Sequence, residues 1–85
     1  MRITVLLFGA EREAAGASKA LVELSHGDKA PPNCGTLRAA MGKAVPALQD
    51  ALLTARFAVN GEFADDSRML VEGDEVALIG PVGGG

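Results

Sequence analysis

Two apolar segments near opposite ends of the chain constrain its fold more than any other feature. Residues 3–8 read Ile-Thr-Val-Leu-Leu-Phe and residues 75–79 read Glu-Val-Ala-Leu-Ile. A short run that is apolar on both faces is typical of a central strand that is covered on both sides. Because parallel pairs lie at buried sheet centres, we expect the first and last strands to be adjacent and parallel.

The first half of the chain beyond residue 8 predicts a short helix, a second strand and a loop. Residues 10–15 are rich in Ala and Glu and are followed by Gly16, which suits a helical turn with a glycine C-cap. Residues 19–24 alternate in polarity as a strand does. Residues 26–35 hold Gly, Asp, Pro and Asn and predict a loop.

The second half predicts a helix and then strands. Thr36 is a plausible N-cap for a helix with one apolar stripe, and Pro46 ends that helix or begins a second short one. Apolar alternation resumes at residues 57–59, followed by Asn60-Gly61, the strongest short-range signal for a β-hairpin.

This order of elements predicts an α+β fold. An 85-residue chain allows one small domain, and strands before and after a helix suit a mixed sheet with helices packed on one face. The pattern alone supports only this α+β class, with residues 1–80 as the folded domain and residues 81–85 as a flexible C-terminal tail.

Composition excludes several functional classes. Eight basic residues against eleven acidic ones give a net charge of −3, and the basic residues are scattered, so neither nucleic acid nor an anionic membrane is an expected partner. One cysteine and one histidine exclude a disulfide within the chain and the usual Cys/His zinc sites, so no metal is expected. No segment is long enough to span a bilayer, and we expect the chain in the cytoplasm.

Groups able to catalyse a reaction are scarce. Cys34 and His26 fall in the predicted loop, and nothing in the sequence brings them together with a serine or an aspartate. We expect Cys34 to be a small surface or half-buried cysteine and Asp65-Asp66 to form a solvated turn. The chain is therefore poorly equipped to be an enzyme on its own.

The informative stretch is the end of the chain, Pro81-Val82-Gly83-Gly84-Gly85. Glycine has no Cβ, so consecutive glycines can thread a narrow channel that a side chain would block. Five extended residues reach roughly 16 Å, enough to enter the active site of another protein. By itself the stretch fits a reactive tail with a terminal carboxylate as well as it fits a frayed terminus.

Four motifs occur in an order that resembles the small sulfur-carrier subunit of molybdopterin synthase, a ubiquitin-like family. Residues 8–16 are similar to its aromatic residue, spacer, Arg-Glu and glycine, residues 57–62 to its hairpin, and residues 72–76 to its Gly-Asp-Glu turn. The Pro-Val and terminal Gly-Gly complete the set, and the resemblance implies a β-grasp (ubiquitin-like) fold for residues 1–80. Two positions depart from the family pattern: Gly80 replaces the first of two prolines, and Gly83 replaces a Ser or Ala.

The resemblance implies that a ubiquitin-activating-like adenylyltransferase consumes ATP to adenylate Gly85. A persulfide sulfur donor then yields a C-terminal thiocarboxylate, which attacks the pterin precursor in the large catalytic subunit of the synthase. That subunit is expected to supply the acid–base groups, and no permanently bound cofactor is expected.

The same resemblance assigns roles to the residues around the tail. Gly83 and Gly84 give clearance, and Pro81 and Val82 aim the tail. Phe8 belongs either to a partner-facing apolar surface or to the core. Arg12 contacts a partner or is simply an exposed helix charge.

Three other functions remain open: a carrier for thiamine or another sulfur product, a ubiquitin-like modifier that forms isopeptide bonds with lysines, and a non-covalent interaction module.

Overall fold

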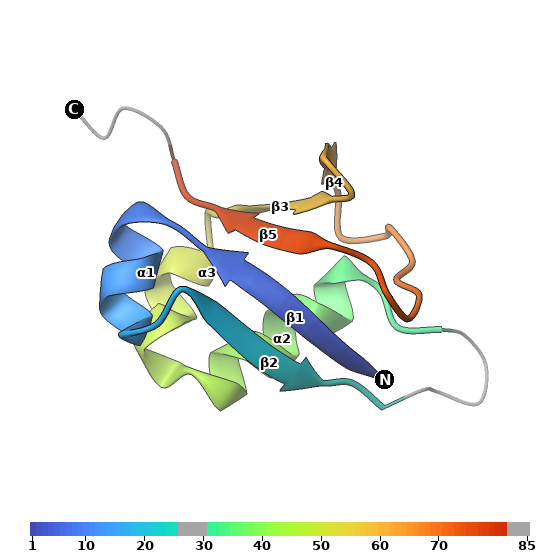
Figure 1. Ribbon diagram of the computed structural model, residues 1–85, viewed down its shortest axis with the longest axis horizontal. Coiled ribbons are helices and arrows are strands. Elements are labelled where there is room, and N and C mark those ends of the chain that lie inside the picture. The colour runs from blue at the N-terminus through green and yellow to red at the C-terminus, as the bar shows by residue number, and fades with distance from the viewer. Residues whose placement is uncertain (26–30, 82–85) are drawn as a thin grey trace.

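The computed structural model describes residues 1–25 and 31–81 (Figure 1). Within these residues five strands form one sheet in the order β2-β1-β5-β3-β4. The elements are β1 (Arg2–Leu7), α1 (Gly9–Ala15), β2 (Lys19–Glu23), α2 (Cys34–Ala44), the 3-10 helix η1 (Pro46–Leu48), α3 (Gln49–Leu52), β3 (Arg56–Val59), β4 (Glu62–Ala64) and β5 (Val76–Ile79). In the described part of the chain, no helix is long and apolar enough to cross a membrane.

The first and last strands lie side by side and parallel at the centre of the sheet, as the sequence predicts. Val5, Leu6 and Leu7 of β1 pair with Val76, Ala77 and Leu78 of β5. β2 pairs with β1 and β3 pairs with β5, both antiparallel. The sheet is therefore mixed, and the α+β prediction is confirmed.

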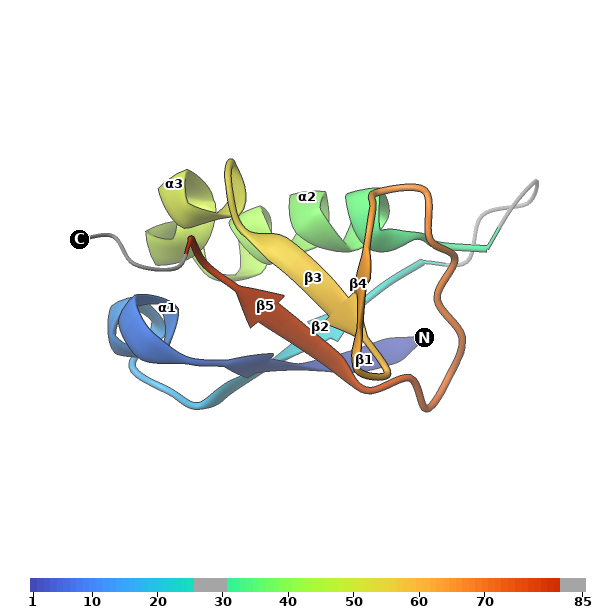
Figure 2. The same cartoon turned by 90° about the horizontal axis from the view of Figure 1, so that it is seen from above.

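The helices α2, η1 and α3 cover one face of this sheet (Figure 2). The core lies between the two layers and contains fully buried side chains from both of them, among them Val5, Phe57 and Leu78 from the sheet and Leu37 and Met41 from α2. The short helix α1 packs against η1 at the end of the sheet where β1 finishes and β5 leaves (Figure 1).

The expectation that the central strands are covered on both faces is wrong. Val5 and Leu7 are buried under the helices, whereas the alternating residue Leu6 is only partly buried. In β5, Val76 and Leu78 are buried while Ala77 and Ile79 are only partly buried. The described helices lie on one side of the sheet, so none of them covers its other face (Figure 2).

The helix α2 begins earlier than the sequence predicts. Its N-cap is Asn33, whose Oδ1 accepts hydrogen bonds from the backbone N–H of Thr36 at 2.8 Å and from the Thr36 hydroxyl at 3.1 Å. Thr36 thus lies inside the helix and is not its cap, and Cys34 is the first helical residue and no part of a loop. The predicted role of Pro46 is confirmed because it opens η1.

The predicted hairpin turn forms at Asn60-Gly61. Both residues have positive φ, 53° and 85°, and β3 and β4 flank them with Val59 opposite Glu62. The Asn60 side chain also joins this turn to the one before β5. Its amide donates to Asp74 Oδ1 at 2.9 Å, and its Oδ1 accepts from the Glu75 N–H at 2.9 Å.

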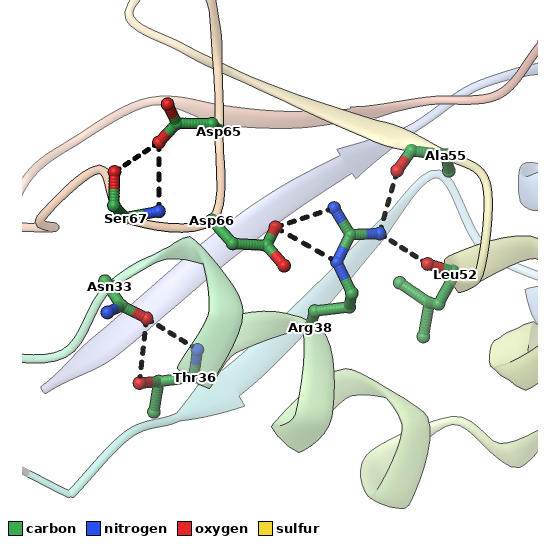
Figure 3. A network of polar contacts seen from close by, with 8 residues as sticks. All are labelled: Asn33, Thr36, Arg38, Leu52, Ala55, Asp65, Asp66 and Ser67. Atoms are coloured by element: carbon green, nitrogen blue, oxygen red, sulfur yellow. Dashed lines mark hydrogen bonds and ion pairs between the residues drawn. The ribbon is translucent and has the colours of Figure 1, made fainter.

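A single arginine joins α2 to the segments around β3 (Figure 3). The guanidinium of Arg38 donates to the carbonyl oxygens of Leu52 and Ala55 and forms an ion pair with Asp66 at 3.0 Å. It also lies 5.2 Å from the centroid of the Phe57 ring. These contacts explain Arg38 as a structural residue.

Candidate functional site

The end of β5 positions the base of the predicted tail. β5 pairs with β1 on one side and with β3 on the other, so Ile79 is held at the sheet centre. Gly80 and Pro81 follow directly, and Pro81 is exposed. The remaining predicted tail residues, Val82, Gly83, Gly84 and Gly85, lie outside the described residues, as does His26.

A pocket of about 270 Å³ lies at this base. Residues 8–11, from the corner between β1 and α1, form one wall, and residues 78–81 form the other. Phe8 is 51% exposed there, so its side chain belongs to the surface and not to the core. Because the two walls come from the central strand pair and its extensions, the pocket lies where Gly80 and Pro81 leave β5.

Among the described residues, Glu11 is the one charged residue that lines this pocket, and it is only 9% exposed. Its carboxylate lies against the backbone of Gly80. A Cβ built at Gly80 would come within 2.5 and 2.7 Å of the two Glu11 oxygens. In residues 1–25 and 31–81, no hydrogen bond or ion pair reaches this carboxylate, and its oxygens keep contact with solvent through the pocket.

The accessible face of the sheet continues from the pocket as an apolar row. Leu6, Ala77, Ala58 and Phe63 stand opposite one another across β1, β5, β3 and β4, and Ile79 lies in the next row. We call these five residues the open face. Phe63 is 58% exposed, and the Arg56 guanidinium lies 4.3 Å from its ring centroid. Apolar surface of this kind, rimmed by charge, is typical of a protein interaction site.

The described residues hold no assembled catalytic group. Cys34 is fully buried, contrary to the expected surface or half-buried position, and burial raises the pKa of its thiol. Asp65 accepts two hydrogen bonds from Ser67 and Asp66 pairs with Arg38, so the acidic pair serves the local structure (Figure 3). No group of three His, Cys, Asp or Glu side chains suited to a metal occurs in the ranges that the structure describes.

The structure brings some of the predicted site residues together. Phe8 and Pro81 lie at the same pocket. Arg12 is exposed on α1 and its role as a partner contact stays a prediction. The sequence reasoning assigned no role to Glu11 or to the open face. The apolar residues on both faces of β1 and β5 carried a signal for the open face, but nothing local paired Glu11 with Gly80.

Comparison with known proteins relates the whole chain to one family. The model of the ThiS family matches residues 5–85. A molybdopterin synthase sulfur carrier subunit of Chlamydomonas reinhardtii is 39% identical over 87 residues, covering 100% of both chains. A molybdopterin synthase sulfur carrier subunit of Mycobacterium tuberculosis is 36% identical over 86 residues, covering 100% of this chain and 99% of the relative.

Solved structures agree with the fold. The crystal structure of SAMP1 from Haloferax volcanii superposes with a TM-score of 0.82 at 26% identity, covering 100% of both chains. The complex of subunits 1 and 2 of molybdopterin-converting factor from Helicobacter pylori includes a chain that superposes with a TM-score of 0.68 at 23% identity, again covering 100% of both chains. The predicted β-grasp fold is thereby confirmed.

Proposed function

The chain belongs to the ThiS family, and from this premise we propose that it is the sulfur carrier subunit of molybdopterin synthase, acting in the cytoplasm in molybdenum cofactor biosynthesis. The observation that carries the proposal is the full-length similarity to a relative of that name at 39% identity. The chain carries sulfur and is not itself the catalyst. The two relatives that are named sulfur carrier subunits support this assignment.

We assign the reactive group to the carboxylate of Gly85. With a pKa of about 3.5, a terminal carboxylate is ionised at neutral pH and resists nucleophiles. Attack of one of its oxygens on ATP forms an acyl-adenylate and releases pyrophosphate. A persulfide sulfur then attacks the acyl carbon and expels AMP. A second thiol cleaves the resulting acyl disulfide, which leaves a thiocarboxylate on Gly85 and a disulfide on the donor.

The large subunit of the synthase is the partner that receives this tail. We propose that it covers the open face, because β5 is the central strand of that face and also the strand that leads into the tail. The known complex of subunits 1 and 2 of the Helicobacter pylori factor supports a two-subunit assembly for a chain of this fold. Acid–base groups for sulfur transfer then come from the large subunit.

Reconstitution tests the proposed function. The full chain is incubated with an adenylating enzyme, ATP, a persulfide donor, the large subunit and the pterin precursor, and the dithiolene product is measured. We expect product with the full chain and none with a chain that lacks Gly84 and Gly85. Thermal melting of both proteins controls for folding. Product formation by the truncated chain would refute the assignment of the tail.

A second function is favoured by the similarity to SAMP1, which is described as a small archaeal modifier protein. A modifier would place the Gly85 acyl group on lysine amines of other proteins. Mass spectrometry of lysates that contain the tagged chain separates the two functions. Lysine adducts that end in Gly85 support the modifier, whereas thiocarboxylate without such adducts supports the sulfur carrier.

A further inference from the structure

The pocket at the base of the tail contains a charged group, the Glu11 carboxylate, to which the proposed function assigns no role. Glu11 is nine-tenths buried, and the other described residues that line the pocket are apolar or contribute backbone. A carboxylate that lies mostly within a pocket loses part of its solvation, and a cation that enters with good geometry offsets this cost. The described residues supply no such cation.

Gly80 keeps the carboxylate at this position. Any side chain at residue 80 would meet the Glu11 oxygens at 2.5 to 2.7 Å and would push the flexible carboxylate away. The glycine therefore lets the backbone at the base of the tail lie directly against Glu11. A group bound to Glu11 would touch the chain one residue before Pro81.

Size and lining indicate what the pocket can hold. Its volume of about 270 Å³ is below the range of roughly 300–1,000 Å³ that is typical of small-molecule pockets. Apolar walls formed by Phe8, Leu78 and Ile79 with a carboxylate between them suit one long cationic side chain. The aliphatic stem of a lysine or arginine packs on apolar surface while its head reaches the charge.

We propose that this pocket receives a lysine or arginine side chain of the large synthase subunit, which pairs with Glu11 and fixes the direction of the tail. This inference rests on the proposed function. A protein that takes up the tail must pass close to residues 80 and 81 and so covers the pocket. The receiving site also binds an anionic thiocarboxylate, so positive charge on that surface is complementary to Glu11.

The test is a titration of the large subunit with four forms of the chain: the parent, Glu11→Gln, Glu13→Gln and Gly80→Ala. Glu13 is the matched control, because it is exposed on the same helix and its change removes the same charge. Truncation of one partner of a buried charge pair weakens binding strongly, whereas rim charges matter little. We expect Glu11→Gln to raise Kd by roughly tenfold or more and Glu13→Gln to leave it within about twofold.

Gly80→Ala gives an independent arm. It should weaken binding by displacing the carboxylate, and the double variant Glu11→Gln/Gly80→Ala should bind no worse than Glu11→Gln alone. Thermal melting confirms that each variant is folded. Equal affinities for Glu11→Gln and the parent would overturn the proposal while leaving the proposed function intact. Failure of the folded parent to bind the large subunit would overturn both.

Discussion

Arg38 gives the sharpest test of how the helical layer is held to the sheet. In Arg38→Met the aliphatic stem is retained, but the carbonyl oxygens of Leu52 and Ala55 lose their cationic donor (Figure 3). These carbonyls lie at the end of α3 and in the connection to β3, where backbone acceptors have no helical donor. The change therefore leaves two acceptors without this partner and also removes the contact with the Phe57 ring.

The expected loss follows from these contacts. A hydrogen bond from a charged donor contributes about 1.5–3 kcal/mol, and the 25% exposure of the Arg38 side chain reduces the sum of the two. The ion pair with Asp66 adds little, because the Asp66 side chain is 58% exposed. We expect Arg38→Met to lower the free energy of unfolding by about 2–3 kcal/mol, which is roughly 10–20 °C in Tm for a domain of this size.

Urea unfolding followed by circular dichroism measures this loss, and Asp66→Asn is the control. That control removes the ion pair and keeps the carbonyl contacts, so it should cost less than about 1 kcal/mol. Sulfur transfer by folded Arg38→Met should equal that of the parent, because Arg38 lies outside the tail base and the open face. A loss no larger than that of Asp66→Asn would refute the reasoning.

Three further predictions concern the turns and the cysteine. Gly61→Val should lower the unfolding free energy by about 1–2 kcal/mol, because Gly61 has φ of 85°; an unchanged urea midpoint would contradict this. Cys34→Ala should retain sulfur transfer while losing about 1 kcal/mol of stability, since its thiol is buried; loss of transfer in the folded variant would revive a thiol mechanism. Hydrogen bonds from the Val71 N–H and the Asn60 side chain lower the pKa of Asp74. Asp74 therefore stabilises the fold above its unfolded pKa of about 4 and less as pH falls through its folded pKa. The stability gap between the parent and Asp74→Ala should shrink below about pH 4 in urea titrations, and a constant gap would exclude this role.

The strands and the hairpin could be predicted because their signals are local. Alternation marks β2 and β3, and Asn60-Gly61 dictates its own turn. The start of α2 could not be predicted in the same way. Asn33 and not Thr36 is the N-cap because a distant segment holds the chain at this point. The Cys34 N–H donates to the Arg68 carbonyl, and the Gly35 N–H donates to the Asp66 carbonyl. Local cap preferences rank Asn and Thr too closely to decide this.

The open face shows a second limit of sequence reasoning. An apolar residue such as Leu6 or Ile79 looks the same in the sequence whether its own chain or a partner protein covers it. The sequence therefore predicted the central position of β1 and β5 correctly, but it wrongly predicted that the chain itself covers both faces of these strands. The pairing of Glu11 with Gly80 joins residues far apart in the chain. The parallel pairing of β1 with β5 brings the segments that carry them together.

The intact mass of the chain after activation tests the central claim most directly. The full chain is incubated with the adenylating enzyme, ATP and the persulfide donor, and is then measured whole and after proteolysis. We predict an increase equal to the mass difference between one sulfur and one oxygen, located on the peptide that ends in Gly85 and absent from a chain that lacks Gly84 and Gly85. An unchanged mass, or sulfur located on Cys34, would contradict the assignment of this chain as a carrier that bears sulfur at its C-terminus.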